Sequence, residues 1–308
     1  MVAAATGRHI HHHEQLRREM LIIDTDPGVD DSVAIMAFQS PGAVQVLGLT
    51  TIFGNCTMER ATRNALILCE KAGHPEIPAA EGSSEPLKGG KPHVADFVHG
   101  SDGLGNIELP DPSIKKFPGE VSVLALGPLT NIALAIKRDP SFVKNVKRIV
   151  VLGGAFSAAG NVTPAAEANI YNDPDAADLV FTCGGDIYVV GLNNNNANED
   201  LLELRNSEGR HTHSSFATYA DSTWTGMHTK SYGVPVVYLH DPVSFATLVR
   251  PDLFKFRKGV VRVETQGMGL KKWDSENPWT TGYSPISVAW SVDAPKVVEF
   301  VKDLITKK

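Results

Sequence analysis

Short apolar runs alternate with segments of helical periodicity along the first two thirds of the chain. The runs rich in Val, Ile and Leu cover residues 20–24, 44–53, 121–127, 148–154 and 186–192. Helical patterns begin near Asp30 and cover residues 57–72, 130–138 and 174–182. Apolar runs without polar alternation are typical of strands that are buried on both faces. The alternation therefore predicts an α/β protein, Rossmann-like, with an open, mainly parallel central sheet and helices on both faces.

The pattern weakens in the last third of the chain. An Asn-rich stretch over residues 193–200 leads into a polar segment, and an apolar run returns at residues 236–249. Strands are expected over 258–267 and 286–293, and an amphipathic helix over 294–305. No linker divides the chain, so residues 19–308 are expected to form a single domain. Residues 1–18, which are rich in His, are expected to form a disordered tail.

Charge and cysteine content limit the class of partner and the compartment. The 308 residues carry a formal net charge of −6 and show no basic patch, which argues against nucleic acid or an anionic membrane as partner. The N-terminus lacks the apolar core of a signal peptide. The three cysteines, Cys56, Cys69 and Cys183, are odd in number and widely spaced. These features predict a cytoplasmic protein without disulfides or a Cys-rich zinc site.

Four aspartates crowd the stretch "DTDPGVDD", namely Asp24, Asp26, Asp30 and Asp31. Two carboxylates roughly 5 Å apart repel by about 3 kcal/mol at an effective dielectric of about 20. Core-like runs flank the stretch, so exposure to water does not explain it. Helix capping explains one aspartate and not four. Carboxylates without Cys or His favour Ca²⁺ or Mg²⁺ over Zn²⁺, so the stretch predicts a hard divalent cation.

The same stretch has a second interpretation. Aspartate-nucleophile phosphatases of the haloacid dehalogenase type also place D-x-D after a first parallel strand, with Asp24 as nucleophile and Asp26 as acid. The Pro-Gly pair after Asp26 does not suit their usual continuation. This interpretation also needs further Thr/Ser, Lys and acidic motifs in order along the chain.

Further motifs narrow the choice: "TIFGN", "HGSDGLGN", "LGPLTNIALA", "NVTPAAEANIYNDPDAA" and "YLHDP". With these motifs, residues 20–301 resemble the inosine-uridine-preferring nucleoside hydrolases, above all their plant ribohydrolase branch. The resemblance implies the nucleoside hydrolase fold and calcium-dependent hydrolysis of the N-glycosidic bond of ribonucleosides such as uridine, inosine or xanthosine. The alternative is a catalytically silent nucleoside- or ribose-binding protein of the same fold. The joint presence of Asp26, Asp31 and Asp241 argues against that alternative.

The resemblance also implies roles for individual residues. It implies that the calcium ligands are Asp26, Asp31, the backbone carbonyl of Leu126 and Asp241, with Asp26 also acting as general base for the attacking water. The residues implied to contact the ribose hydroxyls are Asp30, Asn55, Asn161, Glu167, Asn169 and Asp241. Asp, Glu and Asn are the residue types that read vicinal hydroxyls by hydrogen bonds.

Three residues are candidates for assisting departure of the base: His240, His99 and Tyr232. Their alternative roles are a core histidine, a solvated loop residue and a packing aromatic, respectively. The Asn-rich stretch and an apparently shortened loop near residues 266–272 depart from the family pattern, so the preferred base stays open. The resemblance further implies a small-molecule ribonucleoside as partner and a homodimer or homotetramer.

Overall fold

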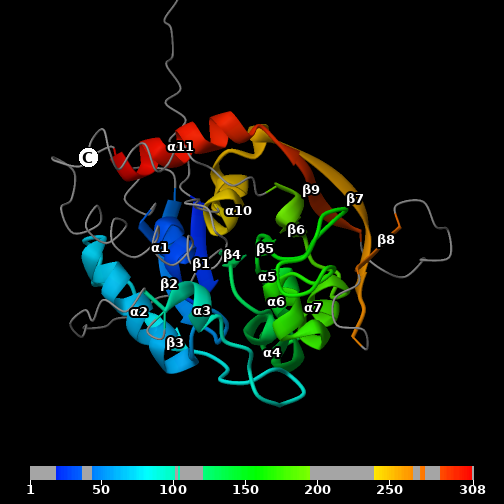
Figure 1. Cartoon of the computed structure of the whole chain (residues 1–308), viewed down its shortest axis with the longest axis horizontal. Helices are drawn as coiled ribbons and strands as arrows, with labels where there is room; N and C mark the ends of the chain where they lie inside the picture. The colour runs from blue at the N-terminus through cyan, green and yellow to red at the C-terminus, as the bar shows by residue number, and fades with distance from the viewer. Residues whose placement is uncertain are drawn as a thin grey trace, which may run out of the picture.

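The computed structural model describes residues 19–36, 44–100, 103–104, 121–194, 239–265, 271–274 and 285–306. Within these ranges, nine strands form a sheet in the order β3-β2-β1-β4-β5-β6-β9-β7-β8 (Figure 1). Their bounds are β1 Glu19–Thr25, β2 Val44–Thr51, β3 Ala79–Glu81, β4 Ser122–Ala125, β5 Ile149–Leu152, β6 Ile187–Val190, β7 Phe254–Val263, β8 Lys271–Asp274 and β9 Ile286–Val292. In this order, the first seven strands, β3-β2-β1-β4-β5-β6-β9, pair in parallel with their neighbours. Strand β7 pairs antiparallel with β9 on one side and with β8 on the other. The predicted mainly parallel sheet is confirmed.

Helices cover both faces of this sheet. One face carries α1 (Val29–Met36), α2 (Met58–Lys71), α10 (His240–Val249) and α11 (Ala294–Thr306), and the other carries α4 (Thr130–Arg138) and α7 (Pro174–Phe181). Successive residues of β4 show the division. Leu124 packs in a cluster with Phe245 of α10, whereas Val123 packs in a cluster with Ile132 of α4 and Val180 of α7. This two-sided burial explains why the strands lack polar alternation.

The predicted elements agree with this architecture, and α4 spans the predicted residues 130–138. The strand predicted over 258–267 is displaced, because β7 begins and ends four residues earlier, at Phe254–Val263. The apolar run 236–249 becomes a helix that begins at His240. Short elements were not predicted: β3, β8, α3 (Asp96–His99), α5 (Phe142–Asn145), α6 (Ala168–Asn172) and the 3₁₀ turns Leu192–Asn194 and Pro251–Leu253. The predictions for residues 1–18, for the Asn-rich stretch beyond residue 194 and for most of the loop near 266–272 lie outside the described residues.

The strand order creates a crevice at the carboxyl ends of β1 and β4. From β1 the chain proceeds to β2 on one side of it, while β4 lies on its other side, so the strand order reverses at β1. In open parallel sheets, ligands bind beyond the carboxyl ends of the strands at the point where the order reverses. Backbone hydrogen bonds extend the pairing past the strand ends: Leu126 N–H donates to Asp24 O at 2.7 Å, and Ile52 N–H donates to Thr25 O at 3.1 Å. Asp26 is thereby fixed next to the end of β4.

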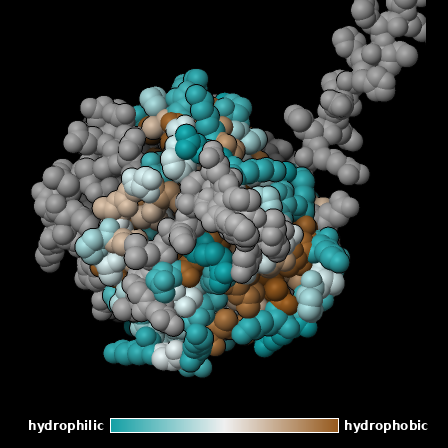
Figure 2. Space-filling view, turned by 90° about the vertical axis from the view of Figure 1, so that its right-hand side faces the viewer, coloured by the Kyte–Doolittle hydropathy of each residue, from teal (hydrophilic) through white to brown (hydrophobic). Residues whose placement is uncertain are grey.

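No helix in the described part of the chain is long and apolar enough to cross a membrane. Figure 2 shows the side of the molecule that faces right in Figure 1, where hydrophilic and hydrophobic side chains lie next to one another.

The buried carboxylate of Asp173 holds the connection between α6 and α7. Its Oδ1 accepts the Ala176 N–H at 3.0 Å, and its Oδ2 accepts the Leu87 N–H and the Thr130 hydroxyl, each at 2.6 Å. We expect Asp173→Ala to lower the free energy of unfolding by about 2–4 kcal/mol, because a helix cap and two further partners are lost. Chemical denaturation would measure this change. Asp139→Ala, which removes an exposed carboxylate, is the control, and equal losses in both variants would contradict the prediction.

Candidate active site

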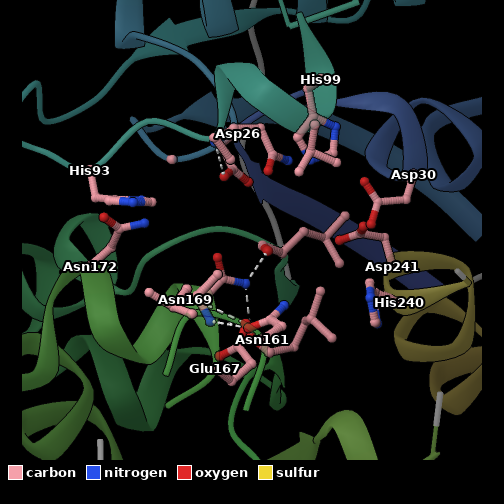
Figure 3. A pocket seen from close by; sticks show the side chains of 18 of the residues that line it. Asp26, Asp30, His93, His99, Asn161, Glu167, Asn169, Asn172, His240 and Asp241 are labelled. Carbon is pink, nitrogen blue, oxygen red and sulfur yellow. Dashed lines mark hydrogen bonds between the residues drawn. The ribbon is translucent and has the colours of Figure 1, made fainter. Parts of the chain in front are cut away.

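A cavity opens at the crevice between β1 and β4 (Figure 3). Its walls come from the ends of β1, β2, β4 and β5 and from α1, α3, α6 and α10. The predicted site residues that line it are Asp26, Asp30, Asn55, His99, Leu126, Asn161, Glu167, Asn169, His240 and Asp241. The structure therefore brings together residues that are up to 215 positions apart in the sequence (26 to 241). Tyr232 lies outside the described residues.

Three carboxylates form what we call the acidic cluster: Asp30, Asp31 and Asp241. Each offers an oxygen, and these oxygens lie within 4.8 Å of one another. Asp30 and Asp31 occupy the first turn of α1, and Asp241 occupies the first turn of α10. The two helices pack against each other, so their N-termini direct the cluster toward one point. Helix N-termini favour negative charge, which partly offsets the repulsion.

Burial and mutual repulsion dominate the electrostatics of the acidic cluster. Burial, followed by the charge of Asp30, raises the pKa of Asp31 to about 7. Burial and the charges of Asp31 and Asp30 raise the pKa of Asp241 well above its usual value. Burial also acts to raise the pKa of Asp30. The charges of His99 and His240 and a hydrogen bond with Asp241 outweigh it, so the pKa of Asp30 is lowered. The three groups cannot all ionise near neutral pH unless a cation balances them.

Asn55 links Asp31 to Asp26. Its Nδ2 donates to Asp31 Oδ2 at 2.9 Å, and its backbone N–H donates to Asp26 Oδ2 at 2.8 Å. Asp31 also accepts the Thr25 hydroxyl and the Gly28 N–H. A Cβ at Gly28 would lie 2.6 Å from Asn55 Nδ2, so the turn before α1 requires glycine there. These hydrogen bonds fix the orientation of the Asp26 and Asp31 carboxylates.

The Asp26 side chain lies against the backbone of two glycines, Gly54 and Gly127. A Cβ at Gly54 would lie 2.0 Å from Asp26 Oδ2, and a Cβ at Gly127 would lie 2.8 Å from Asp26 Oδ1. Asp26 is 1% exposed, and its Oδ1 has no hydrogen-bond partner within the described part of the chain. Burial, followed by the charge of Asp31, raises its pKa well above the usual value. Asp26 therefore has one oxygen available to accept a proton or to bind a cation.

The donor set fits a hard metal ion. The Oδ1 atoms of Asp26, Asp30 and Asp241 are buried without a hydrogen-bond partner among the described residues. Carboxylate oxygens are the ligands that Ca²⁺ and Mg²⁺ prefer. Of the predicted ligands, Asp31 and Asp241 belong to the acidic cluster, and Asp26 lines the same cavity. Asp30, for which contact with ribose is predicted, also belongs to the cluster.

Asn169 joins the ends of β4 and β5. Its Nδ2 donates to the carbonyl of Leu126 at 2.6 Å and to that of Leu152 at 3.2 Å. The Leu126 carbonyl, which is a predicted metal ligand, is therefore held in position by a residue predicted to contact ribose. A carbonyl oxygen keeps a second lone pair for a further partner.

Glu167 caps the N-terminus of α6. It accepts the backbone N–H groups of Gly154 at 2.8 Å, Asn169 at 2.9 Å and Ile170 at 3.2 Å. Asn161 accepts the Ala168 N–H through its Oδ1 at 2.9 Å. These backbone bonds fix both side chains before a ligand arrives, as preorganised binding sites require.

The two predicted histidines differ in their environments. His99 Nδ1 accepts the N–H of Val29, the first residue of α1, at 3.2 Å. In the neutral ring the proton of His99 is therefore on Nε2. His240 is half-buried, and removal from water lowers its pKa although Asp30 and Glu167 act in the opposite direction. The participation of either ring in departure of the base stays a prediction.

Sequence reasoning did not select three polar residues that the structure places at or near the site. His93 and Asn172 line the cavity. Asn131 donates to Asp24 at 2.8 Å, and burial raises the pKa of Asp24 to about 6. The "GPLTN" motif could have indicated Asn131. Asn172 lies within the motif "NVTPAAEANIYNDPDAA" but was not selected from it, and no pattern indicated His93.

Comparisons with known proteins agree with this geometry. Residues 21–299 match the family model described as "Inosine-uridine preferring nucleoside hydrolase". The chain is 62% identical to "Probable uridine nucleosidase 2" of Oryza sativa subsp. japonica, over 93% of each chain. It is 58% identical to "Uridine nucleosidase 1" of Arabidopsis thaliana, over 94% of each.

A solved structure described as "Plant nucleoside hydrolase - PpNRh1 enzyme" has 40% sequence identity and a TM-score of 0.85. The match covers 94% of this chain and 99% of that one.

Proposed function

Since the chain belongs to the inosine-uridine preferring nucleoside hydrolases, we propose that it acts on uridine and that Ca²⁺ is the metal of its acidic cluster. It is an enzyme that hydrolyses the N-glycosidic bond of ribonucleosides to free base and ribose. The names of two plant relatives, both uridine nucleosidases, support uridine over inosine and xanthosine. A panel of nucleosides tested for ribose release would decide among these substrates, and no release from any of them would favour the silent binding protein.

The observation that carries the proposal is the convergence of four aspartates at one cavity, which Asp26, Asp30 and Asp241 line and beside which Asp31 completes the acidic cluster. Asp26, Asp31 and Asp241 have raised pKa values because burial and neighbouring carboxylates disfavour their charged forms. A bound cation reverses this effect. The donors are oxygens only. The acidic cluster comes from α1 and α10, and Asp26 and the Leu126 carbonyl add oxygens from the ends of β1 and β4, which suits the larger and more flexible coordination of Ca²⁺.

We assign the proton transfer to Asp26. Ca²⁺, when bound, would supply positive charge that lowers the pKa of a water molecule in the cavity. Asp26 Oδ1 lacks a hydrogen-bond partner among the described residues, and Oδ2 is held by the Asn55 N–H, so Oδ1 is the oxygen that takes the proton. The neighbouring carboxylates stabilise the positive charge that develops on the sugar as the bond to the base breaks.

We assign stabilisation of the departing base to His240. It occupies the first position of α10, beside Asp241, and its ring lines the cavity near Asp30. A donor in this place would stabilise the departing base. His99 is the second candidate, and Tyr232 the third.

Metal removal tests the cation directly. We expect dialysis against a chelator to reduce ribose release from uridine by at least about 10²-fold, because the acidic cluster then carries protons in place of a cation. Added Ca²⁺ should restore the activity. Isothermal titration of the metal-free protein with Ca²⁺ gives a readout that does not depend on activity, and Asp241→Asn should weaken the binding. Full activity after chelation would contradict the assignment.

We also propose a cytoplasmic location and a homodimeric or homotetrameric assembly. Cys56, Cys69 and Cys183 are all free thiols, which suits a reducing compartment. The assembly follows from the resemblance alone, and size-exclusion chromatography with light scattering would measure it.

A further inference from the structure

A half-buried side chain at the start of α4 ties together the strand ends on which the active site is built. Asn131 is the second residue of α4. Its Nδ2 donates to Asp24 Oδ1 at 2.8 Å and to the Thr51 carbonyl at 3.0 Å, and its Oδ1 accepts the Ser83 N–H at 2.8 Å. These partners lie at the carboxyl ends of β1 and β2 and just beyond β3. One amide therefore joins three neighbouring strands at the edge where the cavity opens.

The Asp24 side chain depends on this amide. It is fully buried, and its Oδ1 also accepts the Thr50 hydroxyl at 2.5 Å. Burying a carboxyl group is costly unless hydrogen bonds compensate for the lost water, and Asn131 and Thr50 supply such bonds. Neither Asp24 nor Asn131 is among the described residues that line the cavity. The pair can therefore reach the reaction only through its neighbours.

The Asp24 backbone leads to the proposed metal site. Its carbonyl accepts the Leu126 N–H at 2.7 Å, and the Leu126 carbonyl is a proposed metal ligand. Two residues after Asp24 comes Asp26, whose Oδ1 faces Gly127. Because the Asp24 side chain is held toward α4, the orientation of this strand end is fixed. The positions of the Leu126 carbonyl and of Asp26 follow from it.

The Thr51 carbonyl leads to the same carboxylate from β2. Thr51 is the last residue of β2, and the turn that follows brings the Asn55 N–H to Asp26 Oδ2 at 2.8 Å. A Cβ at Gly82 would lie 2.2 Å from Asn131 Nδ2 and 2.2 Å from the Thr51 carbonyl oxygen, so this close contact requires glycine. The same amide therefore holds both strand ends that position Asp26.

The first turn of α4 is a firm anchor for this amide. Ile132 and Ala133, the next residues of the helix, are buried in the core cluster between the sheet and helices α4 and α7. Thr130 is fully buried, and its hydroxyl donates to Asp173 Oδ2 at 2.6 Å. The position of Asn131 is therefore set by the core and by the start of α7, independently of any ligand.

We propose that Asn131 is a positioning residue for the hydrolysis: it keeps the ends of β1 and β2 in the relative position in which Asp26 and the Leu126 carbonyl can bind the same cation. This role rests on the proposed function, which assigns a cation to these groups. Groups that orient metal ligands from behind typically contribute about 10–100-fold to metal affinity or activity. A displacement of about 1 Å in a catalytic group is enough to slow a reaction by about 10²-fold.

Asn131→Leu removes all three hydrogen bonds and keeps the approximate size of the side chain. We expect isothermal titration of the metal-free variant to show Ca²⁺ binding weakened by about 10-fold, a readout that does not depend on activity. At saturating Ca²⁺, kcat for uridine should fall by about 10–100-fold, whereas KM should change by less than about threefold, because Glu167 and Asn169 keep their own backbone contacts.

Two further variants separate positioning from general destabilisation. Asn131→Asp is isosteric and keeps an acceptor for the Ser83 N–H, but it loses the donor to Asp24 and to Thr51, so it should show the same two losses. Thr182→Val is the matched control, because it removes the hydrogen bond of a half-buried side chain to the Asp178 carbonyl at the end of α7. It should lower stability and leave Ca²⁺ affinity and kcat unchanged.

Wild-type Ca²⁺ affinity and kcat in Asn131→Leu would overturn the positioning role, and so would equal losses in Thr182→Val. Should the leucine variant fail to fold, Asn131→Asp carries the same test. If the wild-type enzyme released ribose from no nucleoside, the proposed function would fail instead, and the Ca²⁺ titrations would still decide whether Asn131 positions the cation ligands.

Discussion

Asp26→Asn should lower kcat by about 10³-fold or more for every nucleoside, because it removes the group that accepts the proton of the attacking water. The substitution keeps the shape of the side chain, which matters because Gly54 and Gly127 leave no room for a larger change. Asparagine oxygen still accepts the Asn55 N–H. Neutralising Asp26 also relieves its repulsion with Asp31, so the variant should melt no lower than the wild type when metal is absent.

His240→Ala provides the contrast that makes this result specific. If His240 assists only the departing base, its loss should cost about 10²–10⁴-fold with a poor leaving group and much less with a good one. A nitrophenyl riboside should therefore largely rescue His240→Ala and leave Asp26→Asn inactive. Measuring kcat for both variants on inosine, uridine and the nitrophenyl riboside tests the division of roles. Equal rescue of both variants, or of neither, would show that the division is wrong.

The sequence predicted the fold because the hydrophobic pattern and the burial have the same physical origin. Leu124 and Val123 face opposite helical layers, so neither position tolerates a polar residue, and the run appears apolar throughout. The helix α4 was predicted with correct bounds because its apolar positions repeat at helical spacing. The elements β3 and α6 were not predicted, because three to five residues are too few to show a period.

The site was predictable where one segment carries several of its groups. Asp24 lies near the end of β1, and Asp26, Asp30 and Asp31 follow that strand, so their proximity follows from the chain itself. Asp241 required the resemblance, since no local pattern brings α10 to α1. The place of Asn172 in the cavity was not predictable, because it differs from an ordinary helix-terminal asparagine only in that its buried Oδ1 has no hydrogen-bond partner among the described residues. Such a feature exists only in three dimensions.

Rejection of 2′-deoxyuridine is the second large effect that we expect. The cavity holds buried carboxylate oxygens of Asp30 and Asp241 that lack hydrogen-bond partners within the described residues. Hydroxyls of ribose are the natural donors for them. A site built to bind a substrate hydroxyl rejects the analogue without it by up to about 10⁴-fold, because its buried polar groups are then left unpaired.

The measurement is kcat/KM for uridine and for 2′-deoxyuridine under the same Ca²⁺ concentration. Asn169→Ala and Glu167→Gln should lower kcat/KM for uridine more than for 2′-deoxyuridine, because these residues are assigned to the ribose hydroxyls. Both side chains are already fixed by backbone hydrogen bonds, so the wild-type enzyme does not have to order them when it binds the sugar. That preorganisation is the reason to expect discrimination in the rate of hydrolysis. Turnover of the two substrates within tenfold of each other would mean that the carboxylates serve the metal alone and that ribose is recognised elsewhere.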